Sequence, residues 1–262
     1  MRIALCVEYD GASFHGWQTQ PAGNTVQDAL EAALTQIASE PITVVCAGRT
    51  DAGVHATAQI VHFDCYAERP LSAWVRGSNA LLPDSVSVRW AHQVDSEFHA
   101  RFSAFNRRYR YLLLNRPQRP GLSHGKLGWF HLPLDLEAMQ SAARYLIGEH
   151  DFSSFRAAEC QARSPVRTVS EASVRREGDV IVVDVQANAF LHHMVRNMVG
   201  SLVYVGKGKH APAWITELIA ARTRSVAAPT FAASGLYLSG VGYEPRWGLP
   251  PLPAPVLSGV LS

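Results

Sequence analysis

The chain has 262 residues, of which 47% are hydrophobic and 18% charged, and its net charge at pH 7 is +2. This length and balance are typical of one large or two modest globular domains, and they exclude collagen, coiled coils and wholesale disorder. No run of about 18 apolar residues is present, so the sequence predicts no transmembrane helix. The first residues also lack the long apolar core of a secretory signal, and we expect a cytoplasmic protein.

The first half of the chain, residues 1–104, predicts strands and helices in alternation. Arg2–Tyr9 predicts a strand that ends at Asp10-Gly11. Thr25 and Asp28 have the spacing of a capping box, and the apolar face of a helix follows from Val26. The further elements expected are strands over Ile42–Ala47, Ala56–Cys65 and Val86–Val94, a loop over Gly48–His55, and a helix over Ala73–Leu82.

The second half, residues 105–244, repeats this plan. Arg108–Asn115 predicts a strand with Tyr109 and Tyr111 on one face and Arg108 and Arg110 on the other. The further elements expected are helices over Asp135–Leu146, His192–Val205 and Pro212–Ala221, a hairpin of Val166–Arg176 with Val180–Ala187, and a strand over Leu236–Tyr243. Strands in hairpin-like succession indicate an α+β fold of two halves. We expect the Pro-rich tail, residues 245–262, to lie outside the fold.

The positive charge of the chain is concentrated in the second half. Residues 1–104 contain 6 Lys/Arg and 11 Asp/Glu, whereas residues 105–262 contain 18 and 11. From Phe98 to Leu134 there is no acidic residue, and aromatic side chains lie between the arginines. This composition fits a nucleic-acid surface and fits a solvated strand and loop equally well.

The loop of residues 47–56, AGRTDAGVHA, is the strongest candidate for chemistry. Gly48 and Gly53 allow tight bends that present Asp51 outward, and Arg49 favours an ionised carboxylate nearby. Such a carboxylate serves as a nucleophile or as a general base. The alternative from spacing alone is an Asx-type turn with an ordinary surface arginine.

This loop resembles the catalytic loop of the tRNA pseudouridine(38–40) synthase family. The resemblance extends through four further groups of motifs in the family's order. They are Tyr9-Asp10-Gly11 with Phe14–Gln18, Arg107–Tyr111, Gly148–Phe155, and Asn188–Asn197 with Gly235–Leu238. Together these motifs cover residues 3 to about 244, and only the Pro-rich tail falls outside the family pattern.

The resemblance implies a fold and an activity. The fold would be two ferredoxin-like, RRM-like halves joined through a mixed, mostly antiparallel central sheet. The activity would be isomerisation of uridine to pseudouridine at positions 38, 39 and 40 in the anticodon stem-loop of tRNA. The resemblance further implies that the protein acts on tRNA as a homodimer. It implies no cofactor, no metal ion and no membrane association.

The resemblance also assigns roles to five residues. Asp51 would be the catalytic carboxylate, and Arg196 its ion-pair partner. Tyr109 would stack on the target base, Leu236 would line the uracil pocket, and Arg49 would fix the loop or contact phosphate. Without the family pattern, Arg196 would be an ordinary helix-surface arginine and Tyr109 a core aromatic, as we expect for Tyr111. His55 is expected to be structural.

Two other classes of function remain as alternatives. A non-catalytic RNA-binding or tRNA-folding module would use the basic half and the tyrosines, but would have no use for Asp51. A metal-dependent nuclease would use Asp51 with His55. The basic turn Gly206–His210 superficially resembles a phosphate loop, but its spacing is wrong, and it is better explained as the end of a helix.

Overall fold

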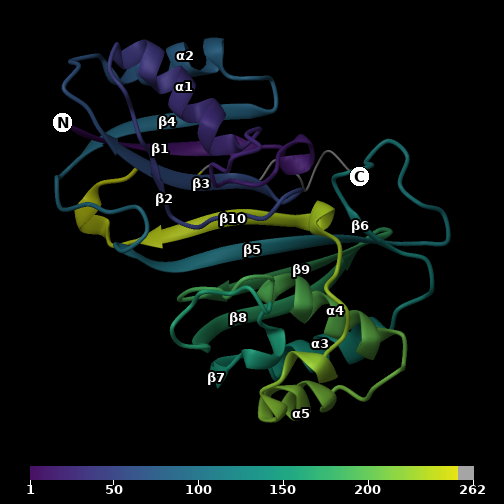
Figure 1. Cartoon of the computed structure of the whole chain (residues 1–262). Coiled ribbons are helices and arrows are strands. Elements are labelled where there is room, and N and C mark those ends of the chain that lie inside the picture. Colours follow the sequence, from purple (N-terminus) through teal and green to yellow (C-terminus); the bar gives the residue numbers. More distant parts are fainter. Residues whose placement is uncertain (253–262) are drawn as a thin grey trace. The chain divides into compact units, whose positions relative to one another are not determined.

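The computed structural model of the protein describes residues 1–252, which form two compact units (Figure 1). Among the described residues, unit 1 combines Met1–Phe105 with residues 237–252, and unit 2 consists of Asn106–Leu236. Residues 237–244, which the sequence analysis placed in the second half, therefore group with unit 1. Residues 253–262 of the expected tail lie outside the described residues.

The strands of unit 1 are β1 (Arg2–Tyr9), β2 (Val45–Cys46), β3 (His55–Asp64), β4 (Val86–Val94) and β10 (Leu236–Tyr243). They form a mixed sheet in the order β4–β1–β3–β10, and the short β2 pairs with β3. β1 is antiparallel to both β3 and β4, whereas β10 runs parallel to β3 with Tyr237 opposite His55. The sheet of unit 1 thus combines strands from the first 94 residues with a strand that begins at residue 236.

The strand expected over Ile42–Ala47 is much shorter, because only Val45 and Cys46 are in a strand. The Ile42 N–H donates to the Thr35 hydroxyl at 3.0 Å, and the Val44 N–H donates to the Glu31 carboxylate at 2.9 Å. These two backbone N–H groups donate to side chains of α1 and not to a neighbouring strand. The alternation of apolar and polar residues in the sequence does not reveal these partners.

Two helices, α1 (Val26–Ala38) and α2 (Leu71–Leu81), pack against each other in unit 1 (Figure 1). The predicted capping box of α1 is confirmed. The Asp28 N–H donates to the Thr25 hydroxyl at 3.2 Å, and the Thr25 N–H donates to the Asp28 carboxylate at 3.3 Å. Val26 and Leu30 are fully buried on the predicted apolar face of this helix.

The start of the Pro-rich tail belongs to the fold. After β10, residues Pro245–Trp247 form a short 3-10 helix, and the Trp247 indole lies edge-on to the Phe98 ring at 5.4 Å. The expectation that the chain leaves the fold at residue 245 is therefore wrong for these first residues, because Trp247 is buried among aromatic side chains.

The strands of unit 2 are β5 (Ala104–Asn115), β6 (Gly128–Phe130), β7 (Gly148–Asp151), β8 (Val166–Glu177) and β9 (Val180–Ala187). β5, β9, β8 and β7 are antiparallel neighbours in that order, and β6 runs parallel to β5. The predicted hairpin of β8 and β9 is confirmed, with Gly178 at φ 56° in its turn. The short strands β6 and β7 were not expected from the sequence.

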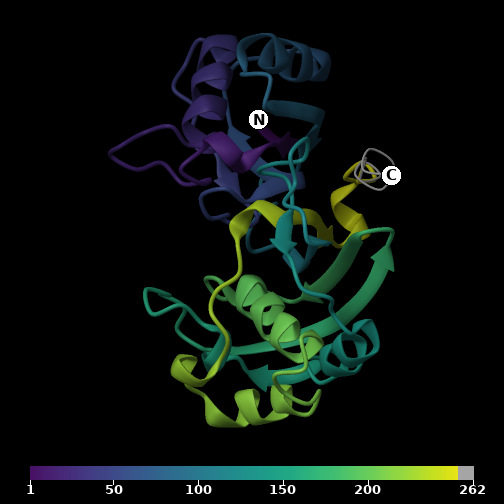
Figure 2. The same ribbon diagram turned by 90° about the vertical axis from the view of Figure 1, so that its right-hand side faces the viewer.

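The helices of unit 2 are α3 (Leu136–Arg144), α4 (Met194–Gly206) and α5 (Trp214–Ala221), and α3 contacts both β8 and α4 (Figure 2). The remaining short 3-10 helices are η1 (Gly11–Ser13) in unit 1 and η2 (Ser153–Phe155), η3 (Arg224–Val226) and η4 (Ala233–Gly235) in unit 2. The predicted α+β class is confirmed, since each unit combines helices with a mixed, mostly antiparallel sheet. Within residues 1–252, every helix is too short or too polar to span a lipid bilayer.

Candidate functional site

The loop that carries Asp51 lies between β2 and β3 and is fixed at its start by a side chain of β3. The Gln59 side-chain amide nitrogen donates to the Gly48 carbonyl at 2.6 Å, and the Gly48 N–H donates to the Gln59 side-chain oxygen, Oε1, at 3.4 Å. Gln59 is fully buried, so this pair of hydrogen bonds forms away from solvent. Gln59 was not among the site residues expected from the sequence.

Thr50 fixes the centre of the loop. Its side chain is buried, and its hydroxyl lies 2.7 Å from the Tyr9 hydroxyl at the end of β1. Its carbonyl accepts a hydrogen bond from the Trp17 N–H at 3.0 Å. Of its two neighbours in the chain, Arg49 is exposed and Asp51 is half-buried.

Two glycines before α1 allow the chain to approach this loop closely. A Cβ atom on Gly11 would lie 1.9 Å from the Val54 carbonyl oxygen. A Cβ atom on Gly16, which has φ +94°, would lie 2.8 Å from the Thr50 carbonyl oxygen. Both distances are shorter than any ordinary contact, so side chains at these positions would displace the Asp51 loop. The motif at residues 9–18 therefore shapes this loop.

Asp51 begins a tight turn. The Val54 N–H donates to the Asp51 carbonyl at 3.1 Å, and Gly53 has φ +77° within this turn. The carboxylate-bearing residue thus lies on a short turn that is held on one side by Thr50 and on the other by the start of β3. This rigid presentation suits an acid–base or nucleophilic carboxylate, because catalysis needs reacting groups held in position.

His55 has the structural role expected of it. It is 1% exposed, and its Nδ1 lies 3.0 Å from both the Gly11 nitrogen and a carboxylate oxygen of Asp10. Its ring stacks on Tyr237 with centroids 4.6 Å apart. These contacts join η1, β3 and β10 within unit 1.

Tyr109 occupies the centre of β5 in unit 2. It lies opposite Val185 of β9, and its ring meets the Phe190 ring edge-on at 5.0 Å. The segment that carries Phe190 is anchored beside it, because the Arg107 guanidinium donates to the Asn188 carbonyl at 3.0 Å. Two motifs far apart in the sequence, residues 107–111 and 188–197, therefore meet in unit 2.

Arg196 lies in the first turn of α4 and is half-buried, whereas Val195, Met198 and Leu202 of the same helix are buried. Its Nε donates to the Phe231 carbonyl at 2.8 Å, and the Phe231 N–H donates to the Arg196 carbonyl at 3.3 Å. This reciprocal pair ties α4 to the chain segment that leads into β10.

The same segment is held by Tyr111, whose hydroxyl donates to the Ala232 carbonyl at 2.8 Å. Tyr111 is fully buried, which agrees with the core role expected for it. Gly235 passes so close to Tyr111 that a Cβ atom there would lie 2.6 Å from its ring. Leu236 follows directly, is 5% exposed, and is fixed in place by this close packing.

Asn197 is a second residue that the sequence analysis did not single out as functional. Its side-chain oxygen accepts hydrogen bonds from the Thr230 hydroxyl at 2.7 Å and from the Arg224 guanidinium at 3.2 Å. Its amide nitrogen donates to the Phe155 carbonyl at 2.7 Å. Its place in the Asn188–Asn197 motif was the only signal for it in the sequence.

The five candidate residues are thus divided between the units. Arg49 and Asp51 belong to unit 1, and Tyr109, Arg196 and Leu236 belong to unit 2. Residues outside the sequence motifs help to hold them, since Gln59 fixes the start of the Asp51 loop and the Phe231 carbonyl accepts from Arg196. The roles assigned to them from the family resemblance stay predictions.

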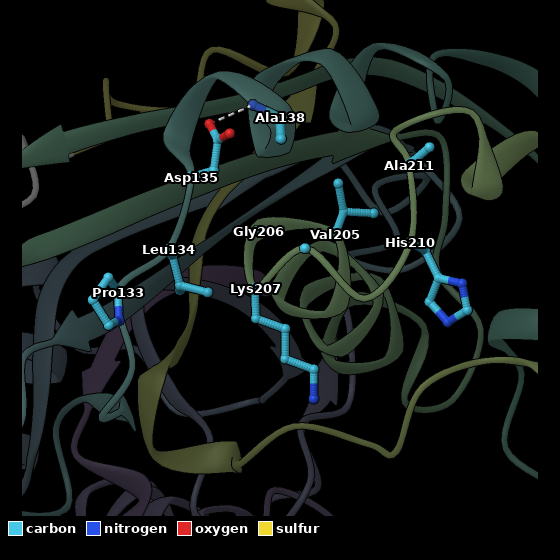
Figure 3. Close-up of a pocket in the computed structure, with 10 residues that line it drawn as sticks. Pro133, Leu134, Asp135, Ala138, Val205, Gly206, Lys207, His210 and Ala211 are labelled. Carbon is cyan, nitrogen blue, oxygen red and sulfur yellow. Dashed lines mark hydrogen bonds between the residues drawn. The ribbon is translucent and has the colours of Figure 1, made fainter.

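The basic turn at the end of α4 lies at a different place in unit 2. A depression of about 700 Å³ lies between the start of α3 and residues 205–211, and Figure 3 draws the residues that line it. The N–H groups of Lys207 and Gly208 donate to the Val203 and Val205 carbonyls and end the helix, as the sequence predicted. The Lys207 ammonium lies 3.9 Å from the centre of the Tyr204 ring. None of the five candidate residues lines this depression.

Comparisons with known proteins connect the site to a family. A family model described as tRNA pseudouridine synthase matches residues 5–103 and 142–244, which include Arg49, Asp51, Arg196 and Leu236. Among curated proteins, the chain is 62% identical to the tRNA pseudouridine synthase A of Dechloromonas aromatica (strain RCB), over the full length of both chains. It is 62% identical to the protein of that name from Aromatoleum aromaticum, covering 95% of each chain. For the protein of that name from Methylobacillus flagellatus, the identity is 59%, covering 95% of this chain and 96% of the relative.

Proposed function

Because the chain belongs to the tRNA pseudouridine synthase family, we propose that it isomerises uridines 38, 39 and 40 in the tRNA anticodon stem-loop with Asp51 as the catalytic carboxylate. Family membership carries the reaction class, the isomerisation of uridine to pseudouridine in tRNA. The observation that supports Asp51 is its setting. It is a half-buried carboxylate on a short turn fixed by Thr50, Gln59 and two close-packed glycines.

The reaction breaks the glycosidic bond between C1′ and N1, turns the base, and forms a bond between C1′ and C5. The proton on C5 leaves to solvent and N1 gains a proton, so the product is an isomer of the substrate. Asp51 either attacks C1′ or removes a ribose proton, and both routes need its carboxylate ionised.

Four residues are proposed to bind the substrate or to assist Asp51. Tyr109 supplies an aromatic face for the uracil, because a base lifted from its stack regains stacking on such a ring. Leu236 supplies an apolar wall for the same base. Arg49 fixes the loop or supplies a guanidinium group for phosphate, and Arg196 supplies the guanidinium group that the resemblance assigns to the Asp51 carboxylate. The support is the fixed placement of three of them, since Tyr109, Arg196 and Leu236 are each held by hydrogen bonds or packing within unit 2.

A homodimer and a cytoplasmic location complete the proposal. Both rest on the family resemblance and on the sequence composition. Light scattering of the purified protein at micromolar concentration tests the assembly, for which twice the chain mass of 28.7 kDa is expected. A single-chain mass would contradict the dimer without affecting the proposed reaction.

Tritium release from tRNA labelled with [5-³H]uridine tests the function directly, because the C5 hydrogen leaves only when the new bond forms. We expect release by the wild type in EDTA, no release by Asp51→Asn, and tight tRNA binding by both. Asp84→Asn is the matched control, since Asp84 is an exposed aspartate of unit 1. If neither the wild type nor the control releases tritium while all three proteins bind tRNA, the protein is a non-catalytic RNA-binding module instead.

A further inference from the structure

A tightly built turn joins β4 to β5 in unit 1. The Ser103 N–H donates to the His99 carbonyl at 2.8 Å, and the His99 N–H donates to the Ser103 hydroxyl at 3.0 Å. The N–H groups of Arg101 and Phe102 both donate to the His99 Nδ1 at 3.2 Å. We call residues His99–Ser103 the aromatic turn. The N–H groups of His99, Arg101, Phe102 and Ser103 all have acceptors within the turn, and these hydrogen bonds fix its conformation.

The aromatic turn presents a large apolar side chain to solvent. Phe102 is 76% exposed, although phenylalanine is among the residue types most often buried. Its ring stacks on the His99 ring with centroids 4.3 Å apart, and the Arg101 guanidinium lies 5.6 Å from its centre. The ring is therefore supported from one side in a fixed position, next to a positive charge.

The aromatic turn contacts β3 at the residue that pairs with β2, the strand before the Asp51 loop. The Ala100 N–H donates to the His62 Nδ1 at 3.1 Å, and His62 pairs with Val45 of β2, the strand that leads into this loop. Burial raises the pKa of the Cys46 thiol to about 11, and the charges of Arg49 and Arg101 both act to lower it. Arg101 of the turn and Arg49 of the loop thus both lie near the same cysteine.

We propose that the aromatic turn is a second RNA-contacting element of unit 1, in which Phe102 stacks on a nucleobase near the target uridine and Arg101 contacts phosphate. The chemistry of the turn fits this partner, because exposed aromatic rings bind bases by stacking and a neighbouring arginine complements the charge of the backbone. The acid-free stretch from Phe98 to Leu134 contains this turn, and the nearest acidic residue that follows it in sequence is Asp135. Asp95 and Glu97 precede the turn. This inference rests on the proposed function for the identity of the RNA.

Binding of fluorescent tRNA to three variants tests the inference. Phe102→Ala is expected to raise Kd about 5- to 100-fold by loss of one stacked base. It leaves the slope of log Kd against log salt unchanged, because no charge is removed. Phe102→Trp is expected to retain wild-type affinity. Arg101→Gln is expected to reduce the salt slope by about 1, as for one lost phosphate contact.

The matched control is Tyr66→Ala, because Tyr66 is 92% exposed in unit 1 and its ring lies outside the aromatic turn. Equal Kd values for Phe102→Ala and Tyr66→Ala would overturn the inference. So would a change of oligomeric state in Phe102→Ala by light scattering, which would assign the ring to a protein interface. Tritium release by the wild type is scored separately. A wild type that binds tRNA through Phe102 but releases no tritium would refute the proposed function and leave the RNA contact standing.

Discussion

The hydroxyl groups of Tyr9 and Thr50 lie 2.7 Å apart in the interior of unit 1, and they connect the end of β1 to the loop that carries Asp51. Both side chains are buried, so water does not readily replace this hydrogen bond if it is broken. Breaking it therefore costs free energy of folding. Asp51 follows Thr50 directly in the chain. Its position in space therefore depends on a strand more than 40 residues away in sequence.

Thr50→Val tests this dependence. The substitution keeps the shape of the side chain but leaves the Tyr9 hydroxyl without Thr50, and we expect a loss of about 1–3 kcal/mol in the free energy of unfolding. The turnover of the folded enzyme should also fall, because the Asp51 turn loses its anchor. Urea unfolding and tritium release measure the two effects. Thr43→Val, at an exposed position before β2, is the control. Additive effects of Thr50→Val and Tyr9→Phe in a double-mutant cycle would show that the two hydroxyls are not coupled.

Gly16→Ala and Gly23→Ala form a matched pair, since both glycines have positive φ in the segment before α1. Gly23 has no neighbour within 4 Å of an added Cβ, whereas Gly16 faces the Thr50 carbonyl. We expect Gly23→Ala to lose about 1 kcal/mol from backbone strain alone. Gly16→Ala should lose about 3 kcal/mol, together with most of the activity, because steric displacement adds to the strain. Equal losses in thermal unfolding would mean that the loop accommodates the methyl group.

The two tyrosines of β5 are expected to respond differently to removal of their hydroxyl groups. Tyr111→Phe removes the hydrogen bond to the Ala232 carbonyl and should cost about 1 kcal/mol of stability, with turnover of the folded enzyme unchanged. Tyr109→Phe should keep tRNA affinity and change the rate of isomerisation, because we propose that Tyr109 contacts the reacting base. Single-turnover tritium release and tRNA titration of both variants distinguish these outcomes. A Tyr109→Phe rate equal to that of the wild type would remove the hydroxyl from the mechanism.

His62 makes the stability of unit 1 depend on pH. Burial lowers the pKa of its imidazole to about 4, from an ordinary value of 6.5, and the charge of Arg2 acts in the same direction. As the pH falls below 6.5, the unfolded chain gains a proton at His62, whereas the folded protein gains it only near pH 4. The free energy of unfolding therefore falls across this range, by about 2 kcal/mol at pH 5.

Urea unfolding at pH 7.5 and pH 5.0 measures this loss. His62→Asn keeps an acceptor for the Ala100 N–H but has no proton to gain, so its stability should fall less between the two pH values. His124→Asn, at an exposed histidine, should follow the wild type. If His62→Asn shows the same pH dependence as the wild type, another group is responsible for the loss.

Local rules explain which parts of this fold could be predicted. The α1 capping box and the β8–β9 hairpin depend on residues within a few positions of each other, and both were predicted from the sequence. The shortness of β2 and the burial of Trp247 depend on partners in α1 and at Phe98, which no local pattern reveals. The placement of β10 depends on a partner strand about 180 residues earlier.

In the candidate site, too, some residues could be identified from the sequence and others only from the structure. The Gly48–Gly53 loop and its aspartate stand out because of their composition, and family resemblance singled out Tyr109, Arg196 and Leu236. Gln59, which binds the loop from inside, looks like an ordinary strand residue in the sequence. Its role appears only when the strand places it opposite Gly48, and polar residues that position a site from within the core are generally found only in this way.

The parallel pairing of β10 with β3 has a consequence for how this protein is made. Within residues 1–252, unit 2 is one continuous segment, and its last residue, Leu236, precedes the pairing residues of β10. During translation, unit 2 is therefore fully synthesised while the sheet of unit 1 still lacks one strand. The Asp51 loop is synthesised early, but the sheet of unit 1 cannot pair β3 with β10 until residues 237–243 have left the ribosome. A chain that stops at residue 236 would expose the edge of β3 at His55 and Ala56, next to the loop itself. Incomplete products of translation would thus be both inactive and prone to pair with other strands.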